Sequence, residues 1–228
     1  MTGDRPLMSV ERLTGDAERL PERVVMVFDT SLVPRRGRRR RPDPFRGVAV
    51  GRGNPEVAVV AARGPGAPTA AVTIELLAHL GAGAIVAVGA AGALTDLPTG
   101  SVHVVGAAVS DDGTSAHYGS DLRPDGSLTA GLAAALDSET VTALTTDAPL
   151  TLTAADVARH RQAGDVVEME AAAVFAAARR RGVRAGAVLV VSDHYGDDDW
   201  YLGDPPTVAA ALSTAVSDVV GALRSLDD

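Results

Sequence analysis

The chain has 228 residues, which is the length of one domain or of one large and one small unit. Hydrophobic residues make up 46% of it and charged residues 22%, which is typical of a globular protein with a buried core. There is no Lys, so all 21 basic residues are Arg against 29 acidic residues, and the net charge of −8 argues against a general nucleic-acid binder. We expect a single domain over residues 1–228.

The absence of Cys excludes disulfides, thiolate catalysis, zinc fingers and iron–sulfur clusters. The five His are widely spaced along the chain, so we expect no metal site. The first 20 residues mix acidic and basic side chains without an apolar stretch, unlike a secretory signal. We therefore expect a cytoplasmic protein with no membrane partner.

Apolar runs and their boundaries predict the first elements in chain order. Residues up to about 22 form a short helix or arm, and 23–28 form a β-branched strand that ends at Asp29. Residues 34–44 hold six Arg, three Pro and one Gly, which predicts a loop. A second strand is expected at 57–62, and a helix at 68–80 with Gly81 as its stop.

Strands and helices alternate in the second half. Residues 84–88 are short and wholly apolar, which predicts a buried strand, and they run into a glycine-rich exit at 89–92 where backbone can approach a ligand. Further strands are expected at 101–110, 140–144, 165–169 and 185–191, and helices at 128–136, 154–162, 171–181 and 207–226. This order predicts an α/β fold with ligands at the carboxyl ends of the strands.

Two carboxylates lie at the end of the expected strand 165–169. Glu168 and Glu170 are two residues apart, so in a strand they share one face and Met169 points to the other. One explanation is a pair that binds the vicinal hydroxyls of a sugar and offsets positive charge developing on its ring. The other is that one or both cap the N-terminus of the following helix, where acids are favoured. The spacing leaves both explanations open.

A third carboxylate, Asp193, follows the strand expected at 185–191, between Ser192 and His194. A carboxyl shielded from water at such a position can hold a proton at neutral pH and give it to a leaving group. An Asx turn or a helix cap is the alternative, and it is the commoner outcome for an isolated Asp after a strand.

Residues 112–118 (DGTSAHY) bring hydroxyls, an imidazole and a phenol together after a strand. We expect this segment, with His117, to line the mouth of a pocket. The chain has no G-x-S-x-G elbow, so a Ser–His–Asp triad is disfavoured. Neither 64–68 nor 89–92 has the spacing of a Walker A loop or of a dinucleotide fingerprint, which argues against ATP and NAD.

Taken together, these segments resemble the nucleoside phosphorylase-I family, which comprises purine nucleoside phosphorylases, uridine phosphorylases and water-using nucleosidases. Four blocks carry the likeness: GPGAPTAAVTIELLAHLGA at 64–82, VGAAGAL at 88–94, TTDAP at 145–149, and VVEMEAAAVF at 166–175 with SDH at 192–194. The resemblance covers about residues 57–195. It implies a three-layer α/β/α sandwich with a central mixed sheet, and cleavage of the bond between base and ribose by a homo-oligomer without a cofactor.

The resemblance also implies roles for individual residues. Glu170 would hold the ribose 2′ and 3′ hydroxyls, Met169 would pack under the sugar, and Glu168 would border the base or the sugar. Asp193 would protonate a purine at N7, because the Ser-Asp-His form is similar to the purine-cleaving branch. The residues whose backbone would lie along base and sugar are Ala90, Ala91 and Gly92.

The chain departs from the phosphorolytic members of the family at the phosphate site. Those members carry an Arg two residues before the Gly of the VG block and a Ser or Thr just after it, where this chain has Ala87 and Ala90. Their Gly-Asp-Pro loop after the first strand is replaced by FDTS at 28–31, and Leu150 stands where an aromatic is usual. Each lost charge-assisted hydrogen bond is worth roughly 1.5–3 kcal/mol, which argues against ordinary phosphorolysis.

Two explanations of the missing phosphate ligands stay open. In the water-using members a carboxylate at the end of the first strand orients the attacking water, and Asp29 stands near that place. Alternatively, the Arg-rich residues 35–41 fold over this site or a neighbouring subunit's site and hold inorganic phosphate or a phosphorylated substrate, although a solvated loop of like charges is the simpler account of them. We predict hydrolysis of a purine nucleoside, with phosphate-dependent cleavage as the alternative.

A different class of function is a catalytically silent protein that binds a nucleoside through the diol-binding carboxylate alone. Asp193 argues against this class, whereas Ala87 and Ala90 argue for it. A nucleic-acid partner for the Arg-rich loop is the least favoured hypothesis, because one loop on an acidic chain gives only a local electrostatic footprint.

Overall fold

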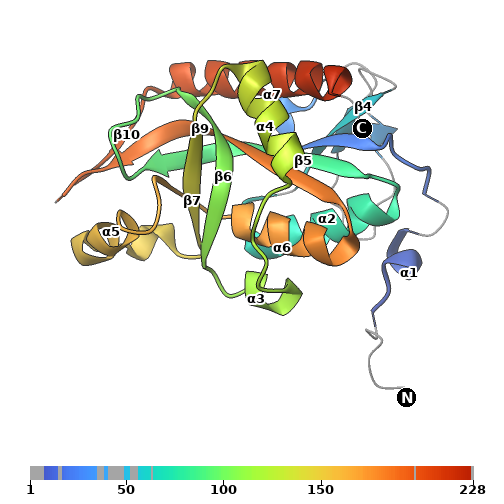
Figure 1. Cartoon of the computed structure of the whole chain (residues 1–228), viewed down its shortest axis with the longest axis horizontal. Coiled ribbons are helices and arrows are strands. Elements are labelled where there is room, and N and C mark those ends of the chain that lie inside the picture. The colour runs from blue at the N-terminus through green and yellow to red at the C-terminus, as the bar shows by residue number, and fades with distance from the viewer. Residues whose placement is uncertain are drawn as a thin grey trace.

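A computed structural model describes residues 8–14, 17–34, 39–40, 49–51, 56–62, 64–197 and 199–226 (Figure 1). Most of the Arg-rich segment 34–44 lies outside the described residues, and so does most of the loop on which the phosphate alternative depends. Within that segment Arg39–Arg40 form the short edge strand β2, which pairs antiparallel with β3 (Ala49–Gly51), where we predicted only loop. Charged residues are common on edge strands, because they oppose pairing with another chain.

A mixed sheet of ten strands forms the centre of the part of the chain that the structure describes. Its order is β10-β9-β6-β7-β8-β5-β1-β4-β3-β2, and β9 also pairs with β5, so that β5, β9, β6, β7 and β8 close a ring. The other strand bounds are β1 (Arg23–Val27), β4 (Val57–Ala61), β5 (Ala84–Ala93), β6 (Val102–Asp111), β7 (Thr140–Thr146), β8 (Val166–Glu168), β9 (Arg184–Tyr195) and β10 (Trp200–Leu202). Strand β1 pairs parallel with β4 and with β5, and β5 pairs parallel with β9. Strand β8 is antiparallel to β5, and β6 is antiparallel to β9.

Helices cover both faces of the sheet, which confirms the predicted α/β/α sandwich (Figure 1). Helices α2 (Ala67–His79) and α6 (Ala171–Arg181) bury their apolar residues on one face. Helices α4 (Gly126–Leu136) and α7 (Pro205–Ser225) do so on the other. The short helices are α1 (Val10–Thr14), α3 (Ser115–Tyr118) and α5 (Ala154–His160), with 3₁₀ turns η1 (Thr30–Leu32) and η2 (Pro149–Thr151).

Glycines in the left-handed region start and stop the helices that flank the site. Gly66, with φ of +112°, turns the chain into α2, and Gly81, with φ of +105°, follows its last turn as predicted. Gly182, with φ of +68°, ends α6, which has the predicted bounds. The Cβ of any other residue would be strained at these positions, so the helix limits follow from the sequence.

Strands β5 and β9 are longer than predicted, and the difference shapes the site. The glycine-rich stretch after residue 88 does not leave the sheet but continues β5 to Ala93, and β9 continues through Asp193 to Tyr195. The two strands run parallel, with a bulge between Ala91 and Gly92 that puts Gly92 opposite Asp193. Pairing along both strands therefore overrides the local turn signals, and it brings the two segments side by side.

Among the described helices, α7 is the one long and apolar enough to cross a membrane, by length and composition. One side of this helix packs onto the sheet beside α4, in the core that its buried residues share with Leu128 and Leu132. Those buried residues are Ala215, Val216, Val219, Ala222 and Leu223.

Candidate active site

A cavity of about 670 Å³ lies where β1, β5, β8 and β9 end. Seven of the nine residues that we predicted for the site line this cavity, and Asp29 and His117 do not. The seven are Ala90, Ala91, Gly92, Glu168, Met169, Glu170 and Asp193. The carboxyl ends of the parallel strands meet at this edge of the sheet, which is where α/β folds collect their ligands.

Glu168 caps the N-terminus of α6. Its Oε2 accepts hydrogen bonds from the backbone N–H groups of Glu170 and Ala171, both at 2.7 Å, and its Oε1 accepts one from the Thr145 hydroxyl. Thr145 Oγ1 in turn accepts the N–H of Ala172 at 2.9 Å. Three N–H groups that begin the helix are thus satisfied by one buried carboxylate and one hydroxyl. Of the two explanations for the Glu pair, helix capping describes the contacts of Glu168.

The buried position of Glu168 makes a pH-dependent contribution to stability. Burial and the neighbouring Glu170 carboxylate raise the pKa of Glu168 from 4.5 to about 7. Between these pH values the folded chain keeps a proton that the unfolded chain has lost, so this contribution is full below pH 4.5 and is lost as pH rises through 7.

We expect Glu168→Gln to abolish this pH dependence, because a Gln carboxamide does not titrate. Relative to the variant, the wild-type free energy of unfolding should fall by about 3 kcal/mol from pH 4.5 to pH 7, at about 1.4 kcal/mol for each unit of pKa shift. Urea denaturation of both proteins across this range measures the difference. A difference that stays constant with pH would contradict the assignment.

Glu170 is held differently and remains directed to the cavity. It occupies the N-cap position of α6, yet its side chain makes no capping bond to that helix. Its Oε1 accepts the backbone N–H of Gly66 at 2.5 Å, from the turn that begins α2, and burial raises its pKa. Met169 lines the same cavity, contrary to the strand alternation that we predicted, because β8 ends at Glu168 and the chain turns there.

Asp193 has two side-chain donors, one for each carboxylate oxygen. The Ser192 hydroxyl donates to Oδ1 at 2.5 Å, and the Trp200 indole Nε1–H donates to Oδ2 at 2.7 Å. Neither contact is the backbone bond of an Asx turn or a helix cap. A Cβ placed on Gly92 would lie 2.7 Å from Asp193 Oδ2 and 2.5 Å from Tyr195 Cε2, so only glycine leaves room for both side chains.

Two predicted site residues lie elsewhere. Asp29 caps η1, where its Oδ1 accepts the N–H of Ser31 at 2.7 Å, and Phe28 lines the cavity in its place. His117 lies on α3 and lines a separate cavity of about 880 Å³ beside α1, α2 and α6. Asp112 bonds to the residues around it and folds 112–118 into a turn of its own, which directs His117 away from the site. The roles assigned to Asp29 and His117 stay predictions.

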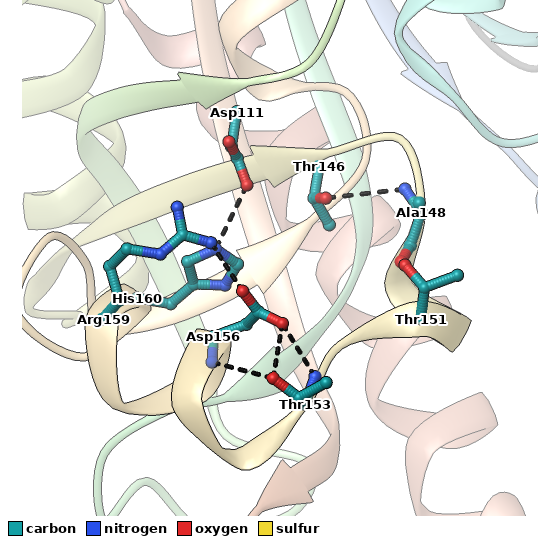
Figure 2. A network of polar contacts seen from close by, with 8 residues as sticks. All are labelled: Asp111, Thr146, Ala148, Thr151, Thr153, Asp156, Arg159 and His160. Atoms are coloured by element: carbon teal, nitrogen blue, oxygen red, sulfur yellow. Dashed lines mark hydrogen bonds and ion pairs between the residues drawn. The ribbon is translucent and has the colours of Figure 1, made fainter.

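Polar contacts fix α5, whose first turn forms one wall of the cavity (Figure 2). Thr153 and Asp156 form a capping box, in which the Asp156 N–H donates to Thr153 Oγ1 and the Thr153 N–H donates to Asp156 Oδ2. At the other end of the helix, buried His160 places Nε2 3.1 Å from Oδ2 of Asp111, the last residue of β6. The capping box therefore fixes the start of the helix, and the contact of His160 with Asp111 ties its end to the sheet.

Prediction from the sequence missed the aromatic side of the cavity. Tyr195 and Trp200 line it, from β9 and from the short strand β10 that pairs with β9. The available signal was a strand followed by four residues with Gly and Asp and then by Trp-Tyr-Leu, which is the pattern of a hairpin. Leu150 also lines the cavity and is 99% exposed.

The lining of the cavity is acidic. Its five carboxyl side chains belong to Glu168, Glu170, Asp193, Asp197 and Asp199, of which Asp197 is paired with Arg161, and no Arg or His is among the described residues that line it. Across the residues that the structure describes, no three acidic or imidazole side chains are grouped so that they could hold a metal ion. Such a lining stabilises a developing cation and disfavours an anionic ligand.

A family model described as the phosphorylase superfamily matches residues 31–223. The chain belongs to the phosphorylase superfamily. This membership confirms the family that the sequence blocks resemble, and with it an enzyme class that cleaves the glycosidic bond of nucleosides. No curated protein sequence matches this superfamily member.

Solved structures of the superfamily share the fold of this member. It is similar to purine nucleoside phosphorylase from Toxoplasma gondii in complex with immucillin-H, with a TM-score of 0.74 and 19% identity over 90% of each chain. Uridine phosphorylase from Vibrio fischeri has a TM-score of 0.75 and 18% identity, covering 91% of this chain and 93% of that one. AMP nucleosidase from Bacteroides thetaiotaomicron has a TM-score of 0.68 and 18% identity over 90% of each chain. At these identities the likeness establishes the fold.

Proposed function

We propose that the protein hydrolyses the N-glycosidic bond of a purine nucleoside. The observation that carries the proposal is that Asp193 and Glu170 line one cavity in which no described lining residue is a cation. Cleavage needs an acid for the base and a carboxylate for the sugar, and these two residues supply both. The reaction needs no cofactor beyond water, and by family resemblance we propose a homo-oligomer.

In the proposed reaction Glu170 accepts hydrogen bonds from the ribose 2′ and 3′ hydroxyls, while Gly66 holds the carboxylate in place. Asp193 gives its proton to a ring nitrogen of the base as the C1′–N bond breaks, and the electron pair of that bond stays on the base. Water then bonds to C1′, and its surplus proton goes to solvent, from which Asp193 is reprotonated. One water is consumed, and free base and ribose are released.

The acidity of the cavity favours water over phosphate as the nucleophile. The sugar becomes cationic as the bond breaks, so carboxylates around it lower the barrier. Phosphorolytic relatives carry phosphate ligands where this chain has Ala87 and Ala90, and the described lining of the cavity offers a phosphate anion carboxyl groups but no Arg or His. The alternative, in which residues 35–41 supply Arg side chains to phosphate, rests mostly on residues outside the described part of the chain.

Substrate class is tested by incubating the protein with adenosine, inosine, guanosine, uridine and cytidine, and by following release of free base by chromatography. We expect release from purine nucleosides, because Ser192, Asp193 and His194 match the purine-cleaving form. Release from pyrimidine nucleosides alone would overturn the purine assignment. Binding of nucleosides without release would support the silent binder instead.

A further inference from the structure

The contact between Trp200 and Asp193 follows from the β9–β10 hairpin. In this antiparallel pair Trp200 lies opposite Tyr195, and Leu202 lies opposite Asp193. Trp200 is therefore the diagonal neighbour of Asp193 on the same face, a separation that a large aromatic side chain spans. Its indole Nε1–H reaches Asp193 Oδ2 at 2.7 Å, and its side chain is half exposed at the cavity.

The other face of the hairpin holds β10 in place. Tyr201 stacks on His194, with ring centroids 4.7 Å apart and planes at 13°, and His194 Nε2 lies 2.8 Å from the Thr99 hydroxyl. The N–H of Gly203 donates to the Ser192 carbonyl at 2.8 Å. The backbone of β10 is thus anchored independently of Trp200, whose side chain can change rotamer without unpairing the strand.

The chemistry of the two donors to Asp193 differs. The Ser192 hydroxyl can donate or accept, so it suits Oδ1 whether the Asp193 carboxyl is ionised or protonated. The indole N–H can only donate a hydrogen bond. On the side where Oδ2 accepts this N–H, it cannot also donate a proton of its own. Trp200 and Asp193 both line the cavity, so a base that takes a proton from the cavity side of Oδ2 has to replace the indole N–H on that side of the oxygen.

We propose that Trp200 is a positioning residue that competes with the purine for Asp193 Oδ2. The indole N–H holds the Asp193 side chain toward the cavity, and an arriving base displaces the indole from Oδ2. Proton transfer then proceeds as in the proposed function, on which this inference rests. Trp200 thereby couples arrival of the base to release of the Asp193 carboxyl from the indole.

The single Trp of the chain makes the exchange observable, because all indole emission comes from Trp200. Titration with adenine or hypoxanthine, excited at the red edge of the indole band, should shift the emission. Asp193→Ala should show the shifted emission without any base. Binding of these bases, measured separately by calorimetry, without a change in emission would overturn the inference and leave the proposed function standing. Absence of both base binding and nucleoside cleavage would overturn both.

Kinetics of Trp200→Phe give a second readout, because Phe keeps a ring but has no N–H. Substrate then need not break the bond to Asp193, so KM should fall about fivefold with kcat changed less than KM. Tyr201→Phe is the matched control, since it keeps the stack on His194 on the opposite face and should leave both constants unchanged. A rise in KM for Trp200→Phe would mean that the indole N–H holds substrate directly, and would contradict competition.

Discussion

Asp193→Asn is expected to lower kcat for purine nucleosides by about 10²–10⁴-fold, the usual contribution of a general acid. The Asn carboxamide is close in size to the carboxyl and its oxygen can still accept one of the hydrogen bonds from Ser192 and Trp200, so the fold should persist. What the variant lacks is a proton acidic enough to give to the base. Steady-state kinetics with circular dichroism separate loss of chemistry from loss of structure.

The sharpest control for this prediction is a substrate whose leaving group needs no proton. A p-nitrophenyl riboside releases p-nitrophenolate, which is stable as an anion without a proton, so Asp193→Asn should cleave this substrate within a few-fold of the wild-type rate. Asp96→Asn, at an exposed position that does not line the cavity, is the matched control and should cleave every substrate normally. If Asp193→Asn lowers kcat by the same factor for the nucleoside and for the nitrophenyl riboside, the general-acid role is wrong.

Glu170→Gln is expected to reduce kcat/KM for ribosides by about 10–100-fold, because each charge-assisted hydrogen bond to a sugar hydroxyl is worth roughly 1.5–3 kcal/mol. The Gln carbonyl can still accept the Gly66 N–H, so the turn before α2 should keep its position. Substrates that lack the 2′ and 3′ hydroxyls cannot make the lost bonds. Their kcat/KM should therefore change little in the variant.

The comparison that decides the role of Glu170 is the ratio of riboside to 2′,3′-dideoxyriboside cleavage. Glu168→Gln is the matched control, because Glu168 lines the same cavity but has its carboxylate oxygens bonded to Thr145 and the start of α6. Its ratio should equal that of the wild type. If Glu170→Gln lowers kcat/KM by the same factor for both substrates, Glu170 does not bind the ribose diol.

Elements with strong local signals were predictable from the sequence. Helix α6 has the predicted bounds because Gly182 stops it, and α2 ends before Gly81 for the same reason. The ends of β5 and β9 were not predictable, because Gly and polar residues usually mark the exit from a strand. Here the pairing of β5 with β9 keeps both in the sheet, and only the tertiary structure contains that information.

Part of the candidate site was likewise predictable from the sequence, and part was not. The carboxylates at the ends of β8 and β9 were found because acids stand out after apolar runs, and the family blocks added the backbone of 90–92. The capping role of Glu168 depends on Thr145, a partner 23 residues away, and the contact of Trp200 depends on a hairpin register. Asp29 follows a strand as expected, yet its side chain accepts a hydrogen bond from the backbone N–H of Ser31 in the turn that begins there.

The most direct test of the account is the identity of the sugar product. The wild-type protein is incubated with the purine nucleoside that it cleaves best, in phosphate-free buffer and again with added phosphate, and base and sugar are separated on one chromatogram. We predict equal rates of base release in the two buffers, with ribose as the sugar product in both. Base release that requires phosphate and yields ribose 1-phosphate would contradict hydrolysis.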